Sequence, residues 1–365
     1  MSPSSPHILD VLYTVDTEFW PRRPYVGASE WKLDYERDVL GRTERGDFGL
    51  EYQLQTLDEY GLRGVFLVEA LCGYVVGTEA VRDMVSRIRR HGHDVQLHLH
   101  PEWLKWMRQS ILPGRRGHHM RDFSLDEQVL LIDRGLEMLR RCGADQVCAF
   151  RAGGFGANLD TLHALSRNGL RYDTSYNDPR LRSACDMRVT QRLLQPQFLN
   201  GVVEVPITFM RVFGHRHRRL QLDCCSSGEI EQTLLTAWRQ RWAVAVIVSH
   251  SFEFIRGRDG VASRGALDPI VLRRFQRLCR FLAEHRDKFR TTTFHDAPGL
   301  DAGLPGDPQP PRARTADTLW RMLEQAWRRV TRPRLETVPA DIAVGHRSPE
   351  ARNLAPAPAQ PIKSL

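Results

Sequence analysis

The sequence predicts an α/β fold in which a parallel sheet curls into a closed or nearly closed barrel. Two observations predict it. Short apolar runs alternate with helical segments from residue 7 to residue 294, and this alternation is typical of strand–helix units around a parallel sheet. About seven or eight such units can be counted, which favours a barrel over an open sheet. In barrels of this kind, functional side chains gather at the carboxyl ends of the strands.

The strands are predicted where short runs rich in Ile, Leu, Val or aromatic residues are bounded by turn residues. These runs are residues 7–15, 64–68, 94–100, 146–151, 170–175, 202–207, 242–249 and 289–294. Helices are predicted where apolar residues recur every three or four positions, as Leu50, Leu54 and Leu57 do before Gly61. They cover residues 49–60, 80–91, 124–141, 158–168, 230–239 and 269–284. Ser124 and Glu127 carry the signature of a capping box at the start of the third helix.

The composition changes after the barrel, which is expected to occupy residues 1–297. Residues 298–314 are rich in Pro, Gly and Arg and are predicted to form a linker, and residues 333–365 a disordered tail. Between them, residues 315–332 combine an apolar stripe with flanking arginines, which predicts a basic amphipathic helix. Such a helix either docks against the barrel or lies on a membrane surface, and the sequence leaves both possibilities open.

The formal net charge of +8 arises almost entirely from arginine. It is explained either by an excess scattered over solvated faces or by an anionic partner, such as a phosphorylated sugar carrier or a membrane surface. No nucleic-acid partner is expected, because the arginines form no stripe interleaved with aromatic residues. Seven cysteines without a CxxC pair argue against a disulfide framework. We see no secretory signal and no apolar run of about 18 residues, so the expected location is the cytoplasm.

Four polar clusters lie where predicted strands give way to loops. Asp16 and Glu18 are two residues apart, so both carboxylates can face the same way; one could bind a metal while the other accepts a proton. His98 and His100 share a face in the same manner and could converge on one ion, leaving coordination positions open for water. Taken singly, these residues are as well explained as polar groups of surface loops.

The other two clusters follow later strands. Arg151 precedes a glycine-rich turn, where its guanidinium can hold a carboxylate ionised and the glycines allow a ligand to approach the backbone. His250 ends an apolar strand, and a histidine in that place is suited to act as a general acid. Together the four clusters form a constellation suited to metal-assisted hydrolysis.

In order and spacing these motifs resemble those of the polysaccharide deacetylase (NodB-homology) superfamily, over roughly residues 7–296. The matching segments are residues 14–18 (TVDTE), 97–101 (LHLHP), 150–155 (FRAGGF), 171–175 (RYDTS) and 249–250 (SH). The resemblance implies a distorted (β/α)7-type barrel, a divalent metal that is often Zn²⁺, and removal of acyl groups from sugars. Carried over by position, it makes Asp16 the catalytic base, Arg151 the residue that orients it, and His250 the general acid.

The resemblance also implies that Glu18 and His98 hold the metal, with two departures from the common pattern. Thr17 stands where a second aspartate is usual, so the ligand must come from Glu18. Glu102 stands where the second histidine is usual, so either His100 or Glu102 completes the site, and His100 is favoured by strand geometry. Contacts with the substrate are expected from Trp20, Glu102, Gly154, Phe155, Asp173 and Tyr176.

The predicted function is thus metal-dependent removal of an acetyl group from an N-acetylated sugar, in bacterial surface polysaccharide or glycolipid biosynthesis. The sugar could be lipid-linked or nucleotide-linked. Two alternatives stay open: a hydrolase of a non-sugar amide on the same barrel, and a catalytically silent carbohydrate-binding protein. The presence of both Asp16 and His250 favours an enzyme, because a binding protein needs neither a base nor an acid.

Overall fold

The structure is a computed structural model that describes residues 7–21, 25, 29–213, 216–256, 265–300 and 308–331. The predicted tail, residues 333–365, and the middle of the predicted linker, residues 301–307, lie outside the described residues. The division of the chain that the sequence suggests therefore stays a prediction.

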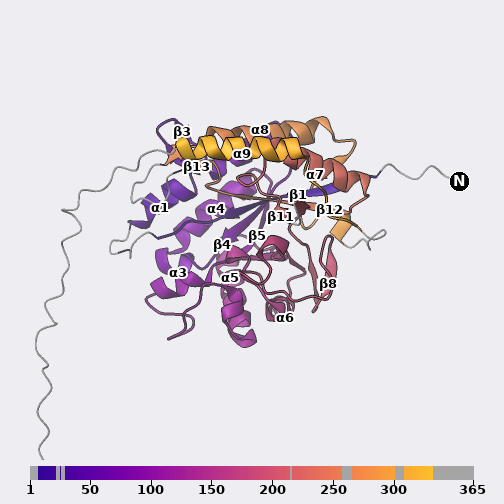
Figure 1. The fold of residues 1–365 in the computed structure, drawn as a ribbon. Helices are drawn as coiled ribbons and strands as arrows, with labels where there is room; N and C mark the ends of the chain where they lie inside the picture. The colour runs from indigo at the N-terminus through magenta and orange to yellow at the C-terminus, as the bar shows by residue number, and fades with distance from the viewer. Residues whose placement is uncertain are drawn as a thin grey trace, which may run out of the picture. The chain divides into compact units, whose positions relative to one another are not determined.

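A parallel sheet forms the centre of the molecule (Figure 1). Its strands follow one another in the order β12, β1, β4, β5, β6, β7 and β9, and every pair in this series is parallel. Their bounds are Val244–His250, Leu9–Thr17, Val65–Glu69, Asp94–Leu99, Ala149–Ala152, Tyr172–Asp173 and Val202–Glu204. Strand β15 (Phe289–Thr291) pairs with the first residues of β1, and β8 (Gln197–Leu199) adds an antiparallel edge to β9. The predicted α/β class with a curled parallel sheet is confirmed.

The six helices predicted between the strands are present. They are α2 (Leu50–Glu59), α4 (Thr78–Arg90), α5 (Leu125–Arg141), α6 (Leu159–Arg167), α7 (Ser227–Arg239) and α8 (Pro269–Glu284). The capping box at Ser124 and Glu127 forms as predicted. Helix α9 (Thr315–Val330) lies in the segment where the sequence predicts a basic amphipathic helix. Within the described residues, the structure adds α1 (Trp31–Asp38), α3 (Gly73–Val76) and five short 3-10 turns. Within the described residues there are also three short antiparallel strand pairs, β2 (Arg42–Thr43) with β3 (Gly46–Asp47), β10 (Phe209–Arg211) with β11 (His217–Arg219), and β13 (Ile255–Arg256) with β14 (Ala266–Leu267).

The barrel has an inner and an outer apolar layer because side chains alternate along each strand. On β1, Leu12 belongs to the inner cluster, whereas Val11, Tyr13 and Val15 pack in the larger cluster that includes the surrounding helices. Asp16 is four residues from Leu12 and therefore shares its inward direction. The side chain of Asp16 thus points into the mouth of the barrel.

Backbone outside the regular strands lies between β9 and β12, the two outermost strands of the parallel series. The amide of Leu220 donates to the carbonyl of Thr208 at 2.7 Å, and the amide of Val248 on β12 donates to the carbonyl of Leu220 at 2.9 Å. The ring is therefore completed by loop segments rather than by a further regular strand, which makes the barrel distorted.

The strand register brings the ends of the strands to one edge. Asp16 on β1 is paired with His250 on β12, and His98 on β5 is paired both with Glu69 on β4 and with Arg151 on β6. Polar side chains that are far apart in the chain thus meet at the carboxyl edge of the sheet. No helix in the described parts of the chain combines the length and hydropathy needed to cross a bilayer.

Candidate metal centre and catalytic groups

Glu18, His98 and His100 form a buried group whose potential ligand atoms all lie within 4.8 Å of one another. Oε2 of Glu18 lies 3.2 Å from Nε2 of His98 and 2.7 Å from Nε2 of His100. Two imidazole nitrogens and one carboxylate oxygen are a donor set typical of catalytic zinc, which keeps a further position open. The residues present therefore fit a divalent cation. Glu102, the alternative ligand, lies on the other side of His100, with Oε2 3.5 Å from its Nδ1.

Hydrogen bonds and packing orient the two histidines. Nδ1 of His98 lies 2.8 Å from the carbonyl oxygen of Arg151, which can only accept a hydrogen bond, and this contact turns Nε2 toward Glu18. The ring of His100 packs against Gly153, where a Cβ atom would overlap it, and meets the indole of Trp20 edge-on, with ring centroids 4.3 Å apart. The glycine-rich turn after β6 therefore makes room for the ring of His100, a candidate metal ligand.

The Glu18 carboxylate and the His100 imidazole shift each other's pKa in opposite directions. Burial tends to raise the pKa of Glu18, but the charge of His100 and hydrogen bonds from both histidines lower it well below its usual range. Burial tends to lower the pKa of His100, and the Glu18 carboxylate raises it to about 10. A proton on His100 and a metal cation would thus compete for the same nitrogen, which makes metal affinity fall as the pH falls.

Asp16 is held by Arg151 inside the mouth of the barrel. Nη1 of Arg151 donates to Oδ1 of Asp16 at 2.6 Å, Nη2 donates to the hydroxyl of Thr14 at 2.8 Å, and Nε donates to the carbonyl of Thr174 at 3.1 Å. The arginine is completely buried and Asp16 nearly so. One oxygen of Asp16 is therefore fixed, and Oδ2 is left on the side of His250.

His250 faces Asp16 across a gap. Its Nε2 lies 3.9 Å from Oδ2 of Asp16, too far for a hydrogen bond. Its Nδ1 lies 2.7 Å from Oε2 of Glu253, whose other oxygen accepts the amide of Asp223 at 2.9 Å. Burial tends to lower the pKa of His250, but the Glu253 carboxylate raises it to about 9. The ring is thus protonated at neutral pH, with one N–H directed toward the gap.

The sequence reasoning missed Glu253 and also Glu69. Glu69 ends β4 and is fully buried; Oε2 accepts the amide of His100 at 2.6 Å and Oε1 the amide of Leu71 at 2.7 Å. Burial raises the pKa of Glu69 to about 8. It fixes the backbone of His100, a candidate metal ligand. In the sequence, Glu69 stands at the end of an apolar run and Glu253 three residues after His250, but neither position indicates the contacts that the side chain makes.

The residues expected to contact substrate lie in different surroundings. Trp20 is half-buried beside His100, and Gly154 is exposed with φ of 60°. Glu102 pairs with the exposed His118 at 2.7 Å, and the ring of Phe155 packs in the inner cluster. Tyr176 is almost fully buried, and its hydroxyl accepts the amide of Leu193 at 3.3 Å.

Asp173 is fully buried and is paired in the sheet with Glu204, which is also buried. Its oxygens accept the hydroxyl of Ser175 at 2.8 Å and the amide of the same residue at 3.2 Å. Burial raises the pKa of both carboxyls, that of Glu204 well above its usual range. These contacts make Asp173 a residue that positions the loop after β7, while its role toward substrate stays a prediction.

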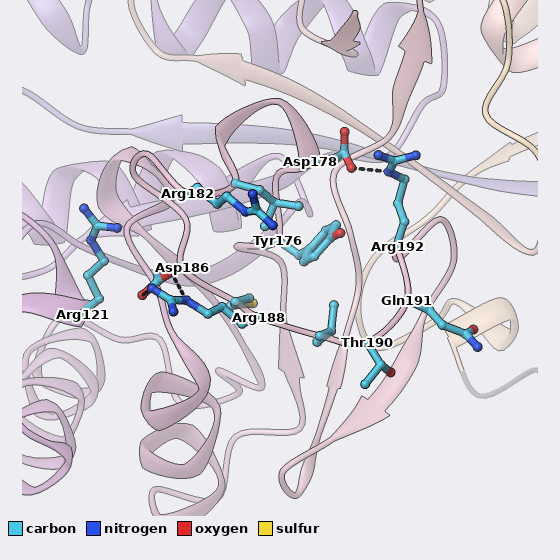
Figure 2. Close-up of a pocket in the computed structure, with 12 residues that line it drawn as sticks. Arg121, Tyr176, Asp178, Arg182, Asp186, Arg188, Thr190, Gln191 and Arg192 are labelled. Atoms are coloured by element: carbon cyan, nitrogen blue, oxygen red, sulfur yellow. Dashed lines mark hydrogen bonds and ion pairs between the residues drawn. The ribbon is translucent and has the colours of Figure 1, made fainter. Parts of the chain in front are cut away.

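An arginine-lined cavity of about 590 Å³ opens beside Tyr176, among segments that follow β5 and β7 in the chain (Figure 2). Arg188 pairs with Asp186 at 2.9 Å and Arg192 with Asp178 at 2.5 Å. Arg121 and Arg182 also line it. Four guanidinium groups and two carboxylates give the lining a net positive charge, which suits an anionic group.

Comparisons with known proteins give similarities in structure only. No protein-family model matches the chain, and no curated protein matches its sequence. A protein of Mycobacterium smegmatis described as a polysaccharide deacetylase is 17% identical, with a TM-score of 0.49, over 85% of this chain and 97% of that one. A family 4 carbohydrate esterase of Streptomyces lividans is 12% identical, with a TM-score of 0.38, over 80% and 97%. A family 4 pseudoenzyme is 9% identical, with a TM-score of 0.39, over 81% and 68%. All three similarities are below 25% in identity and below 0.5 in TM-score, and none of them bears on the substrate of this chain.

Proposed function

We propose that the protein is a metal-dependent hydrolase that removes the acetyl group from the nitrogen of an N-acetylated sugar. The observation that carries the proposal is the meeting of three units at one edge of the barrel. These are the group Glu18, His98 and His100, the pair of Asp16 with Arg151, and the pair of His250 with Glu253. They correspond to a cation site, a general base and a general acid.

In the proposed reaction, Glu18, His98 and His100 hold the cation, for which Zn²⁺ is the expected choice. A divalent cation bound there would act as a Lewis acid on the amide carbonyl and acidify a water molecule. Oδ2 of Asp16 accepts a proton from the attacking water while Arg151 keeps Oδ1 in place. Nε2 of His250 gives its proton to the departing amine nitrogen. A backbone amide near the turn at Gly153 and Gly154 would donate a hydrogen bond to the developing oxyanion.

The arginine-lined cavity supports a finer proposal, that the substrate sugar carries a phosphate, as a lipid-linked or nucleotide-linked sugar does. Guanidinium groups bind phosphate oxygens in pairs. Arg182 is exposed and makes no ion pair within the described residues. Arg182→Gln should raise KM for N-acetylglucosamine 1-phosphate severalfold and leave KM for N-acetylglucosamine unchanged. An equal change in KM for the two sugars, or no change in KM for either of them, would exclude this role for the cavity.

The test of the reaction is acetate release from a panel of N-acetyl sugars. Asp16→Asn should lower kcat by a factor of about 10² to 10⁴. The matched control is Asp160→Asn, which alters an exposed carboxylate at the start of α6 and should leave kcat unchanged. Full activity in Asp16→Asn contradicts the mechanism. If the protein binds the sugars but releases no acetate, it is a catalytically silent carbohydrate-binding protein. If it hydrolyses a cyclic ureide but none of the N-acetyl sugars, it is a hydrolase of a non-sugar amide.

A further inference from the structure

Helix α9 attaches to the barrel through its polar side. Within it, the residues turned toward the protein are Asp317, Thr318, Arg321, Glu324, Gln325 and Arg328, a stripe with helical spacing. The ordinary arrangement of a surface helix is the reverse, with the apolar stripe toward the core. Figure 1 shows α9 lying along α8. The helix thus docks on the barrel, as one reading of the sequence expects, yet it does so with the side that normally faces water.

Three ion pairs hold this polar side in place. Arg321 pairs with Glu229 of α7 at 3.2 Å, Glu324 pairs with Arg274 of α8 at 2.6 Å, and Arg328 pairs with Asp268, the N-cap of α8, at 2.7 Å. Glu229 and Asp268 are fully buried and Arg274 nearly so. Without α9, Glu229 and Arg274 would lose the only ion pairs they make within the described residues, and Asp268 would keep only Arg256, at 3.5 Å. These pairs fix the orientation of the helix around its own axis.

The opposite side of α9 is apolar and exposed. Trp320 is 60% exposed, Leu323 64% and Val330 86%, and Leu319, Met322 and Trp327 are about half exposed. Arg329 is the one charged residue among positions 319, 320, 322, 323, 326, 327, 329 and 330. Contiguous apolar surface of this kind on a protein marks a site of interaction with a partner or a membrane.

Arginines and tryptophans surround this face. Trp320 lines a groove together with Arg273 and Arg277 of α8, and the guanidinium of Arg256 lies 5.9 Å from the centre of the Trp327 ring. Tryptophan prefers the boundary between lipid headgroups and acyl chains, and arginine attracts anionic headgroups. We propose that the apolar face of α9 binds the surface of an anionic lipid bilayer.

The position of α9 relates this surface to the catalytic edge. Nη1 of Arg328 and Nη1 of Arg274 donate to the carbonyl of Asp223 at 3.3 and 3.1 Å, and the amide of Asp223 donates to Glu253. The carboxyl end of α9 is therefore close to the loop that supports His250. A bilayer bound to α9 lies near that edge of the barrel, although the binding itself does not depend on the proposed reaction.

Flotation of the full chain with vesicles tests the proposal. Wild-type protein should float with vesicles of equal parts phosphatidylglycerol and phosphatidylcholine and should bind several-fold less to phosphatidylcholine alone. The double variant Trp320→Ser, Leu323→Ser should lower the partition coefficient more than about tenfold, since two large apolar side chains no longer enter the interface. Phe198→Ser is the matched control, because Phe198 is 70% exposed on β8, away from α9, and should bind as the wild type does.

Two further measurements test whether the double variant is folded and whether a second copy of the chain covers the apolar face of α9. Thermal unfolding should be unchanged in the double variant, because both side chains are exposed; a variant that is folded and floats as well as the wild type overturns the proposal. Size-exclusion chromatography with light scattering addresses a second copy of the chain as occupant. A wild-type dimer that the double variant converts to monomer, together with no vesicle binding, also overturns it.

Discussion

Oε2 of Glu253 lies 2.7 Å from Nδ1 of His250, and this contact turns Nε2 of the histidine toward Asp16. The carboxylate fixes which nitrogen faces the gap and favours the protonated ring. It raises the pKa of His250 to about 9, against the effect of burial. The sequence gives no hint that the candidate general acid has a carboxylate partner of its own.

The first prediction concerns the alkaline limb of the pH profile. A general acid works in its protonated form, so activity falls as the pH rises through its pKa. Glu253→Gln removes the charge that raises the pKa of His250, so the alkaline limb of kcat/KM should move about one to three pH units lower. The surface variant Glu137→Gln on α5 should leave the profile unchanged. An alkaline limb at the same pH in Glu253→Gln would mean that His250 is not the titrating acid.

The second prediction concerns Arg151. Arg151→Met leaves the buried carboxylate of Asp16 without its partner, and breaking a buried ion pair of this kind costs about 3–5 kcal/mol. Chemical denaturation should show the loss. The double variant Arg151→Met, Asp16→Asn should recover part of this stability, because the uncompensated charge is gone. Equal stability of Arg151→Met and the wild type would show that the pair is not coupled in the folded protein.

The third prediction concerns the turn after β6. An alanine at position 153 places its Cβ within the ring of His100, so the ring must move away from Glu18. Gly153→Ala should weaken zinc binding about 10- to 100-fold, as measured by competition with a chromophoric chelator. Gly154→Asn is the control for the turn itself, since asparagine tolerates a φ of 60° and the nearest side chain, His119, is 3.4 Å from the added Cβ. Loss of affinity in both variants would point to the turn rather than to His100.

Much of the fold follows from local patterns. The strand ends at Asp16, His98, Arg151 and His250 are recognisable because buried parallel strands are short apolar runs, and period-two spacing pairs Asp16 with Glu18 and His98 with His100. The same spacing favours His100 over Glu102, and the structure brings His100 next to Glu18. Which residue binds a metal in the protein stays a prediction until an ion is measured.

Other features depend on contacts between distant segments and are not visible in the sequence. Glu69 and Glu204 look like ordinary strand-end carboxylates, and only the register of the sheet shows that they lie beside His98 and Asp173. The amphipathic pattern of α9 predicts which residues form the apolar stripe, but not that this stripe faces away from the barrel. That direction is set by Glu229 and Asp268, which lie 92 and 60 residues away from their partners on α9.

The central claim is that Glu18, His98 and His100 hold a cation needed for N-deacetylation. The most direct measurement is acetate release from N-acetyl sugars by protein whose zinc content is determined in parallel, before and after treatment with a chelator, and in His98→Gln. We predict about one zinc ion per chain, loss of activity with the chelator, recovery on adding Zn²⁺, and neither metal nor activity in His98→Gln, with the exposed His163→Gln behaving as the wild type. Undiminished acetate release from protein that contains no divalent metal would contradict the claim.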